Sequence, residues 1–250
     1  MQQSNLYIIV FSAITTIIIG GLLALASGLL GPTQKKAIEV DTKQQILGAV
    51  MEVEEGADIL ELYTKHISSF VVNYDGEKVE PQDKNGNTVT AERVNIEKEF
   101  DKDPEDRYYP VFVFQQDGSD EPDAYILPVY GNGLWDNIWG FIALQTDLET
   151  IKGARFAHAG ETPGLGARIT EIEVQNRFKG KKIYNELGDL VSVSMMKGEN
   201  NPQDRLDDHH VDGMSGATIT ANGVTEMLEN YFSHYNAFIE KQKNQEISSL

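Results

Sequence analysis

The sequence begins with an apolar run that is long enough to cross a lipid bilayer. Residues 6–30 read LYIIVFSAITTIIIGGLLALASGLL, and no charged side chain precedes Lys35. At about 1.5 Å per helical residue, a run of this length spans a hydrocarbon core of roughly 30 Å. A secretory signal peptide has a basic start and a shorter apolar core. We therefore expect a retained membrane anchor over residues 1–34, with a helix at about 6–30 that Gly31 and Pro32 end.

The charged residues all follow this anchor. The chain has 39 acidic and 21 basic residues, which gives a formal net charge of -18. An acidic domain repels phosphate backbones, so no nucleic acid is expected as a partner. Lys35, Lys36 and Lys43 follow the apolar run, and by the positive-inside rule they favour a cytoplasmic position for the domain.

The chain contains no cysteine. Disulfides, cysteine-ligated iron–sulfur clusters and cysteinyl-flavin links are therefore excluded. Any redox chemistry of this chain must belong to a bound organic cofactor.

The part after the anchor predicts an α+β domain with a mainly antiparallel sheet and flanking helices, because helices precede and follow a series of strands. We expect a helical and then loop-rich N-terminal part over residues 35–110, and the domain core over 111–250. Apolar residues at helical spacing predict two short helices within 41–70, and Asn85-Gly86 predicts a turn. Strands are expected at 111–114, 125–130, 140–144, 155–159 and 190–195, and helices at 166–178 and 220–241.

Three glycine-rich stretches are the candidate sites of chemistry, and the third of them, residues 212–220, precedes the last predicted helix. Free N–H groups at a helix start suit a phosphate, and the small residues Gly216 and Ala217 allow one to approach the backbone. The alternative is an ordinary helix cap that uses the hydroxyl of Thr218 or Thr220.

The other two stretches are residues 131–136 and 160–166. Residues 160–166 do not form a dinucleotide fingerprint, because Ile169 stands where glycine is required. They predict a tight turn that could lie against a flat ring, or else a plain strand-to-helix loop. Arg168 is either solvated or the partner of an anion. Trp135 and Trp139 are the only tryptophans, and each is either near a ligand or part of the core.

Two further groups of residues carry little weight. Asp204, His209 and Ser215 are the residue types of a hydrolase triad, but their closeness in sequence does not support one. The run 207–210, Asp-Asp-His-His, predicts a solvated loop rather than a metal site, since no second cluster of ligands is visible.

Together the three stretches resemble the FMN-binding domain family. Asp212-x-x-Ser215-Gly216-Ala217-Thr218 matches the flavinylation signature of that family, and Gly133-Leu134-Trp135 and the loop 160–166 match its two other turns. The whole chain is similar to the C subunits of sodium-translocating NADH:quinone reductases. The G subunits of Rnf electron-transport complexes share the flavin motif, but they are usually shorter between anchor and first glycine turn than the segment 36–110 here.

The resemblance implies that FMN is joined through its phosphate to the hydroxyl of Thr218, and that a separate flavin transferase installs it from FAD. Asp212 and Ser215 would belong to the signature that the transferase reads, with Gly216 and Ala217 beside the phosphate. The remaining cofactor-binding residues implied by the resemblance border the isoalloxazine ring; they are Glu161, Thr162, Pro163, Gly164, Leu165, Gly166, Leu134 and Trp135.

The resemblance also implies a place in a multi-subunit complex of the bacterial inner membrane. The soluble domain would lie on the periplasmic side, against the indication of the lysines. The subunit would pass single electrons between an iron–sulfur centre and another flavin subunit, and the complex would export sodium. The alternatives are an Rnf-type flavin subunit and, in a different class, a membrane-tethered binding domain without catalysis whose glycine turns are structural.

Overall fold

The computed structural model describes residues 5–116, 119 and 121–248, and its contacts divide the chain into two units, residues 1–43 and 44–250. The described part of the first unit, residues 5–43, belongs to helix α1 (Asn5–Gly48), whose last residues are part of the second unit. By length and composition it is the one helix among the described residues that suits a membrane span, with a mean hydropathy of 2.6 in its apolar window.

The expectation that Gly31 and Pro32 end this helix is wrong, because α1 continues to Gly48 with Pro32 inside it. Proline removes one helical hydrogen bond, but its fixed φ is compatible with a helix. The residues after it are mostly good helix formers. Lys43 and Glu39 add an ion pair of 2.7 Å one turn apart. The expected boundaries at 34/35 and 110/111 between parts of the chain stay predictions.

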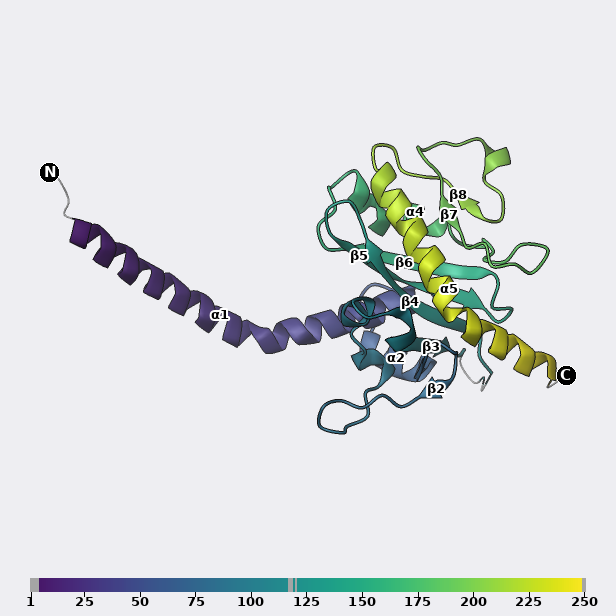
Figure 1. The fold of residues 1–250 in the computed structure, drawn as a ribbon, viewed down its shortest axis with the longest axis horizontal. Helices are drawn as coiled ribbons and strands as arrows, with labels where there is room; N and C mark the ends of the chain where they lie inside the picture. The colour runs from purple at the N-terminus through teal and green to yellow at the C-terminus, as the bar shows by residue number, and fades with distance from the viewer. Residues whose placement is uncertain (1–4, 117–118, 120, 249–250) are drawn as a thin grey trace. The chain divides into compact units, whose positions relative to one another are not determined.

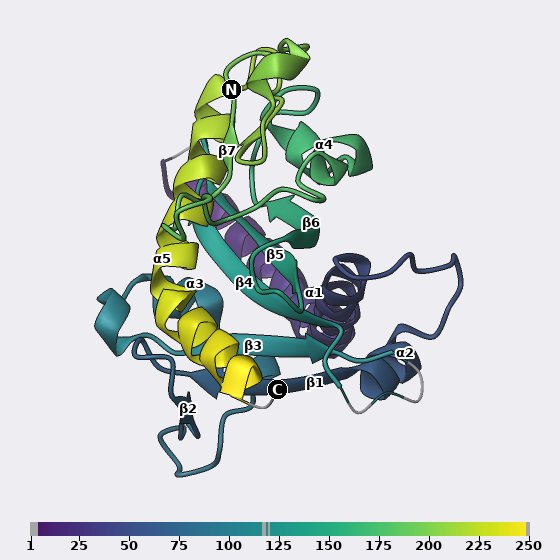
Figure 2. The same ribbon diagram turned by 90° about the vertical axis from the view of Figure 1, so that its right-hand side faces the viewer.

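The second unit is built on a six-stranded antiparallel sheet with the order β2-β1-β3-β4-β5-β6, as Figures 1 and 2 show. This confirms the predicted fold class. The strands of the large sheet are β1 (Ile67–Val72), β2 (Lys78–Val79), β3 (Tyr109–Phe114), β4 (Ala124–Asn132), β5 (Asn137–Gln145) and β6 (Ile151–His158). The other helices are α2 (Ile59–His66), α3 (Ile96–Phe100), α4 (Ile172–Asn176) and α5 (Thr218–Ser248), with short 3-10 turns η1 (Ala91–Arg93), η2 (Pro104–Asp106), η3 (Gly166–Thr170) and η4 (Gln203–Arg205).

Both faces of the sheet are buried, and alternate residues of each central strand enter different cores. In β3, Val111 and Val113 belong to the core that α5 covers, whereas Phe112 and Phe114 belong to the core formed with α2 and residues 46–49. Figure 2 shows α5 on one side of the sheet and α2 on the other. The predicted apolar stripe of α5 is buried, as confirmed for Val224, Met227, Leu228, Tyr231, Phe232, Tyr235 and Phe238.

Three predicted elements differ from the structure. Residues 67–70 form a strand, since the backbone becomes extended at Ile67 and pairs with β3 along its length. Of residues 190–195, only Ser194 and Met195 form a strand, β7, which pairs in parallel with β8 (His210–Val211). The left-handed φ of 62° at Ser192 interrupts the segment before it. The helix expected over 166–178 is two short pieces, η3 and α4, separated by the extended residue Glu171.

Candidate functional site

The three glycine-rich stretches meet at the N-terminal end of α5, and the side chain of Glu161 joins them. Glu161 is only 4% exposed. Its Oε1 accepts hydrogen bonds from the backbone N–H groups of Leu134 (2.7 Å) and Trp135 (3.1 Å), and its Oε2 accepts one from the Thr220 hydroxyl (2.6 Å). One buried carboxylate thus fixes the β4–β5 turn and the first turn of α5 to the loop that follows β6.

Glycines make room for this carboxylate. A Cβ on Gly133 would lie 2.3 Å from Oε1 of Glu161, and one on Gly166 would lie 2.2 Å from Oε2. A Cβ on Gly223, in α5, would meet the carbonyl oxygen of Asn132 at 2.3 Å. Gly133 and Gly166 therefore permit the close packing of the three stretches around Glu161.

Thr218 is the first residue of α5 and is half-buried. The N–H of Ala221 donates to the carbonyl of Ala217 at 2.9 Å, so Ala217 holds the cap position, and alanine has no side-chain acceptor. Within the described residues, no side-chain acceptor bonds the N–H groups of residues 218–220. The hydroxyl of Thr220 donates to Glu161 instead, so the predicted alternative in which Thr220 caps the helix is wrong. The helix start keeps donors suited to an anion.

Apolar side chains around Thr218 are exposed. The exposed fractions are 43% for Leu134, 70% for Trp135, 42% for Leu165 and 57% for Ile219. The indole N–H of Trp135 donates to the hydroxyl of Thr162 at 3.1 Å, which fixes the ring across the two loops. Trp139 differs, because it stacks on Tyr130 and packs against the core.

This arrangement fits a flat aromatic ring tethered at the helix start. Thr162, Pro163 and Gly164 form an exposed turn beside Leu165, and Gly164 and Gly216 both have a φ of +75°. Gly216 also approaches Leu165 closely, since a Cβ there would lie 2.8 Å from Leu165 Cδ2. An apolar ring can cover exposed Leu and Trp side chains while backbone N–H groups bond a phosphate.

A second network holds the segment that precedes Thr218. The Asp212 carboxylate accepts hydrogen bonds from the backbone N–H groups of Asn200 (2.8 Å) and Asn201 (3.0 Å). Partial burial alone would raise the pKa of Asp212, but these bonds and the Asn201 side-chain amide lower it below its ordinary value. The Asp212 side chain is therefore engaged in holding its own loop. Ser215 is exposed, and its N–H lies 3.4 Å from Oε2 of Glu199.

Glu199 is the centre of this second network. Arg168 donates two hydrogen bonds to it at 2.9 and 2.8 Å, and Arg177 donates a third at 2.8 Å. The hydrogen bonds from Arg168 and then Arg177 lower the pKa of Glu199 to about 2. Arg177 also donates to the carbonyl oxygens of Asp212 and Gly213. Of the two interpretations of Arg168, the one that makes it the partner of an anion is confirmed. The anion is the carboxylate of Glu199 in the same chain.

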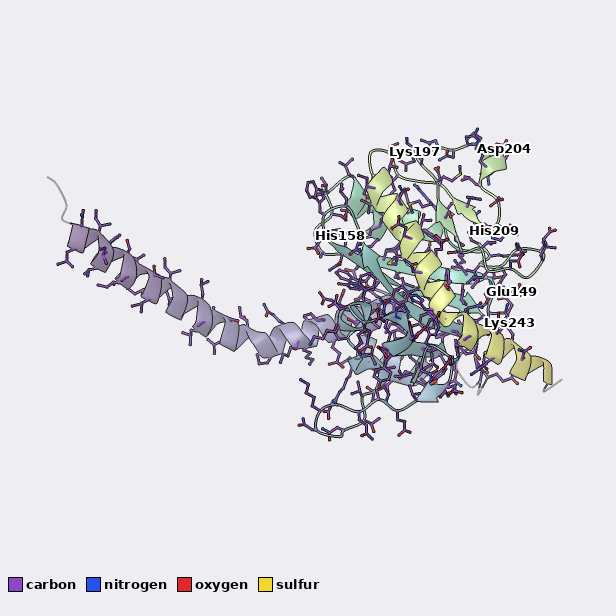
Figure 3. All side chains as sticks on the ribbon, in the orientation of Figure 1. Glu149, His158, Lys197, Asp204, His209 and Lys243 are labelled. Atoms are coloured by element: carbon purple, nitrogen blue, oxygen red, sulfur yellow. The ribbon has the colours of Figure 1, made fainter. Side chains whose placement is uncertain are left out.

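Sequence reasoning did not identify Glu199 or Arg177 as part of the site. Each is an isolated polar residue in the sequence, and only the fold brings it to the glycine-rich stretches. The triad alternative gains no support: His209, labelled with Asp204 in Figure 3, has its Nδ1 2.8 Å from the carbonyl oxygen of Lys182.

Comparison with known proteins agrees with this geometry. Residues 133–233 match the family described as "FMN-binding domain". The chain is 33% identical over 233 residues to the C subunit of the Na(+)-translocating NADH-quinone reductase of Haemophilus ducreyi, with 90% of this chain and 87% of the relative covered. It is 42% identical over 123 residues to the corresponding protein of Pseudomonas aeruginosa, a match that covers 49% of this chain and 46% of that relative.

A solved structure gives the same result. The crystal structure of the C subunit of the Na(+)-translocating NADH-quinone reductase from Parabacteroides distasonis is similar with a TM-score of 0.70 and 39% identity. The match covers 83% of this chain and 95% of that one. Sequence, domain and fold agree on one group of proteins, and the chain belongs to the family of C subunits of the Na(+)-translocating NADH-quinone reductase.

Proposed function

We propose that this chain is an electron-relay subunit that carries FMN covalently, with the phosphate of FMN esterified to the hydroxyl of Thr218. The observation that carries the proposal is the start of α5 at Thr218. There, backbone donors without a side-chain cap lie beside the exposed side chains of Leu134, Trp135 and Leu165. A tethered phosphate would gain the N–H groups and the positive end of the helix dipole.

A flavin transferase with FAD as donor would form this bond. The Thr218 oxygen attacks the phosphorus on the FMN side of FAD, the pyrophosphate bond breaks, AMP leaves, and a base of the transferase takes the hydroxyl proton. Ser215 and Gly216 are exposed, which gives such an enzyme access to the segment next to Thr218. Asp212 contributes by holding that segment in place through Asn200 and Asn201.

When bound, FMN supplies one-electron redox chemistry, and the residues of the chain position it. Leu134, Trp135 and Leu165 would cover one side of the ring and exclude water from it. Thr162 fixes the Trp135 indole through its hydroxyl. The proposed role needs no general acid or base at the site. It needs a cofactor that stays in place at a surface where a partner can approach.

We further propose that α1 anchors the chain in the bacterial inner membrane, with residues 44–250 on the periplasmic side. The relatives are named as subunits of a sodium-translocating NADH-quinone reductase. On that basis, this subunit would pass single electrons between an iron–sulfur centre and another flavin subunit, and the complex would export sodium. Membrane extraction of a tagged chain, followed by identification of co-purified subunits, tests the assignment to this complex.

The test of the attachment uses Thr218→Ala in cells that contain the transferase. We expect the flavin fluorescence of the denatured band to disappear and peptide mass spectrometry to show no modified peptide. Thr170→Ala is the matched control, because Thr170 is an exposed threonine near the same loop whose hydroxyl bonds the carbonyl of Ala167. Flavin that survives denaturation in Thr218→Ala would refute attachment at this residue. Thr220 would be a poor replacement, since it is fully buried and bonded to Glu161.

A further inference from the structure

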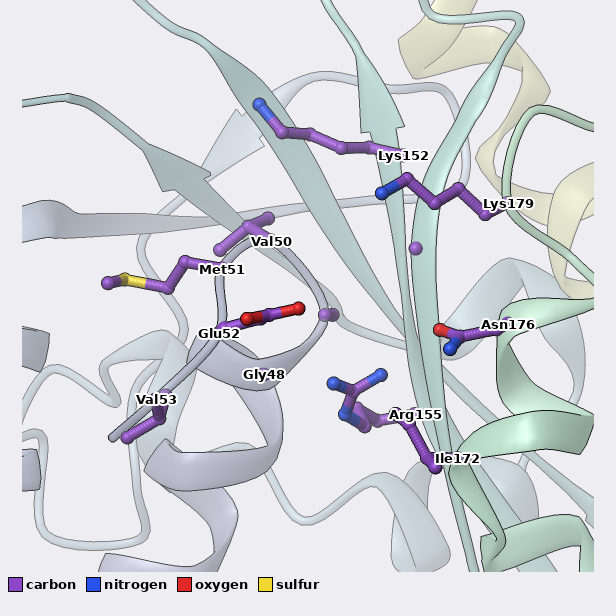
Figure 4. Close-up of a pocket in the computed structure, with 12 residues that line it drawn as sticks. Gly48, Val50, Met51, Glu52, Val53, Lys152, Arg155, Ile172, Asn176 and Lys179 are labelled. Atoms are coloured by element: carbon purple, nitrogen blue, oxygen red, sulfur yellow. The ribbon is translucent and has the colours of Figure 1, made fainter. Parts of the chain in front are cut away.

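A hollow of about 430 Å³ lies at the β6 edge of the sheet, between the segment that follows α1 and helix α4 (Figure 4). It is apart from the candidate flavin site, since its lining includes no residue of the three glycine-rich stretches. Its lining residues are Gly48, Ala49, Val50, Met51, Glu52, Val53, Lys152, Gly153, Arg155, Ile172, Asn176 and Lys179.

Three of these residues are cationic, in a chain whose net charge is -18. Lys152 pairs with Asp123. Arg155 is half-buried and donates to the carbonyl oxygen of Ala154 at 2.9 Å, and no described carboxylate forms an ion pair with it. Lys179 also lacks an ion pair among the residues that the structure describes. Burial lowers the pKa of Arg155. A guanidinium that is partly removed from water and has no ion-pair partner is poorly compensated, so the hollow favours an anion.

The polar side chains of the hollow lie on one of its walls. Figure 4 shows Arg155 on β6, Asn176 at the end of α4 and Lys179 on the turn that follows α4, with their polar ends toward the hollow. The Lys152 ammonium points away from these head groups (Figure 4), and it pairs with Asp123. The opposite wall is the segment 50–53, in which Val50 faces the hollow, whereas the side chains of Met51 and Val53 point away from it (Figure 4) and pack against the core formed with α2. The carboxylate of Glu52 projects into the space between the walls (Figure 4), yet it forms no ion pair with the three cations within the described part of the chain.

We propose that this hollow binds an oxyanion that carries a short apolar body: a phosphate or carboxylate head group on Arg155 and Lys179, with its body against Val50. A hollow of this size lies within the range of small-molecule sites and is larger than a bare phosphate needs. Such a group can come from a soluble phosphate monoester or from an anionic lipid. This inference is independent of the proposed flavin attachment.

Calorimetric titration of the full chain in a nonionic detergent tests the proposal. The probes are phenyl phosphate, inorganic phosphate and phosphatidylglycerol in mixed micelles. We expect saturable binding of phenyl phosphate that is tighter than that of inorganic phosphate. If phosphatidylglycerol binds more tightly than phenyl phosphate, the natural ligand is a lipid. If phenyl phosphate binds more tightly, the natural ligand is a soluble ester. Both results support the site.

Four variants locate the binding. Arg155→Gln should weaken phenyl phosphate binding at least about tenfold, equivalent to about 1.4 kcal/mol. Lys179→Gln should weaken it about threefold, because Lys179 is exposed. Glu52→Gln should strengthen binding, since a like charge is removed. Lys84→Gln, an exposed lysine in a distant loop, is the charge-matched control and should leave the affinity unchanged.

Several outcomes would overturn the proposal. The proposal fails if phenyl phosphate shows no saturable binding. It also fails if Lys84→Gln and Lys179→Gln weaken phenyl phosphate binding equally, because that would indicate an effect of net charge. Equal affinity for inorganic and phenyl phosphate would refute the role of Val50 as the apolar contact. Lys179→Gln keeps the test valid if Arg155→Gln fails to fold, because an exposed lysine without an ion pair is not needed for the fold.

Discussion

Replacement of Glu161 by alanine is expected to destabilise the domain and to reduce flavin loading together. The change leaves two part-buried backbone N–H groups, of Leu134 and Trp135, and the buried hydroxyl of Thr220 without their acceptor. Each unsatisfied buried donor costs about 1–3 kcal/mol, but water can enter beside the exposed Trp135 and offset part of this. We expect a loss of about 3–5 kcal/mol in the free energy of unfolding.

For a domain of about 200 residues, each kcal/mol lowers the melting temperature by roughly 2–4 °C. The variant should therefore melt about 6–20 °C below the parent chain in differential scanning fluorimetry. Glu161→Gln keeps one carbonyl oxygen for the two N–H groups, and its amide can donate to the Thr220 hydroxyl. It should lose less than half as much. Glu226→Ala, which removes an exposed carboxylate from α5, is the matched control and should change the melting temperature little.

The in-gel flavin signal, normalised to protein, completes the assay. Without Glu161, the first turn of α5 is no longer fixed to the loop that follows β6, so the yield of flavinylated chain should fall. The role assigned to this carboxylate would be refuted if the Glu161→Ala chain melts within about 2 °C of the parent chain and still loads flavin fully. A shift of about 2 °C corresponds to a loss of only roughly 1 kcal/mol in the free energy of unfolding.

Two further predictions concern the second network and the left-handed glycines. The folded pKa of Glu199 is about 2, below its ordinary value, so the ionised carboxylate stabilises the fold, and this stabilisation is lost as the pH falls from about 4.5 toward 2. Glu199→Gln should therefore flatten the acid side of a plot of melting temperature against pH. An unchanged slope in that pH range would contradict the prediction. Gly164→Ala and Gly216→Ala should each destabilise the domain by about 1–2 kcal/mol, because both glycines have a left-handed backbone. Only Gly216→Ala should also lower flavin loading, since its methyl group would displace the side chain of Leu165. Equal flavin loading in both variants would refute the role of the contact between Gly216 and Leu165.

The central sheet was predictable because its strands carry strong local signals. Residues 111–114 and 125–130 are rich in β-branched and aromatic side chains, and the turn residues between them predict a hairpin, which β3 and β4 form. Helix α5 was predictable in the same way, because its buried apolar residues recur at helical spacing. These patterns are local, so no knowledge of distant contacts was needed.

The errors arose where a distant contact overrides the local pattern. Residues 67–70 have helical spacing, but pairing with β3, more than 40 residues later, makes them a strand. The site shows the same limit. The three glycine-rich stretches were identified in the sequence, but Glu161 and Thr220, which join them, are 59 residues apart. Glu199 and Arg168 are 31 residues apart. No spacing rule predicts such contacts.

The position of Thr218 between two separate networks explains why so much of the glycine-rich signature is structural. Glu161 fixes Thr220, two residues after Thr218, whereas Arg177 and Glu199 hold the chain at residues 212–215, just before it. The two sets of hydrogen bonds share no member, so loss of one leaves the other in place. An electron relay requires a fixed separation between cofactors, and a tether on one threonine side chain alone leaves its own bonds free to rotate. If FMN is attached as proposed, these networks fix the backbone on both sides of the tether, and the exposed Leu134, Trp135 and Leu165 need only restrict the ring.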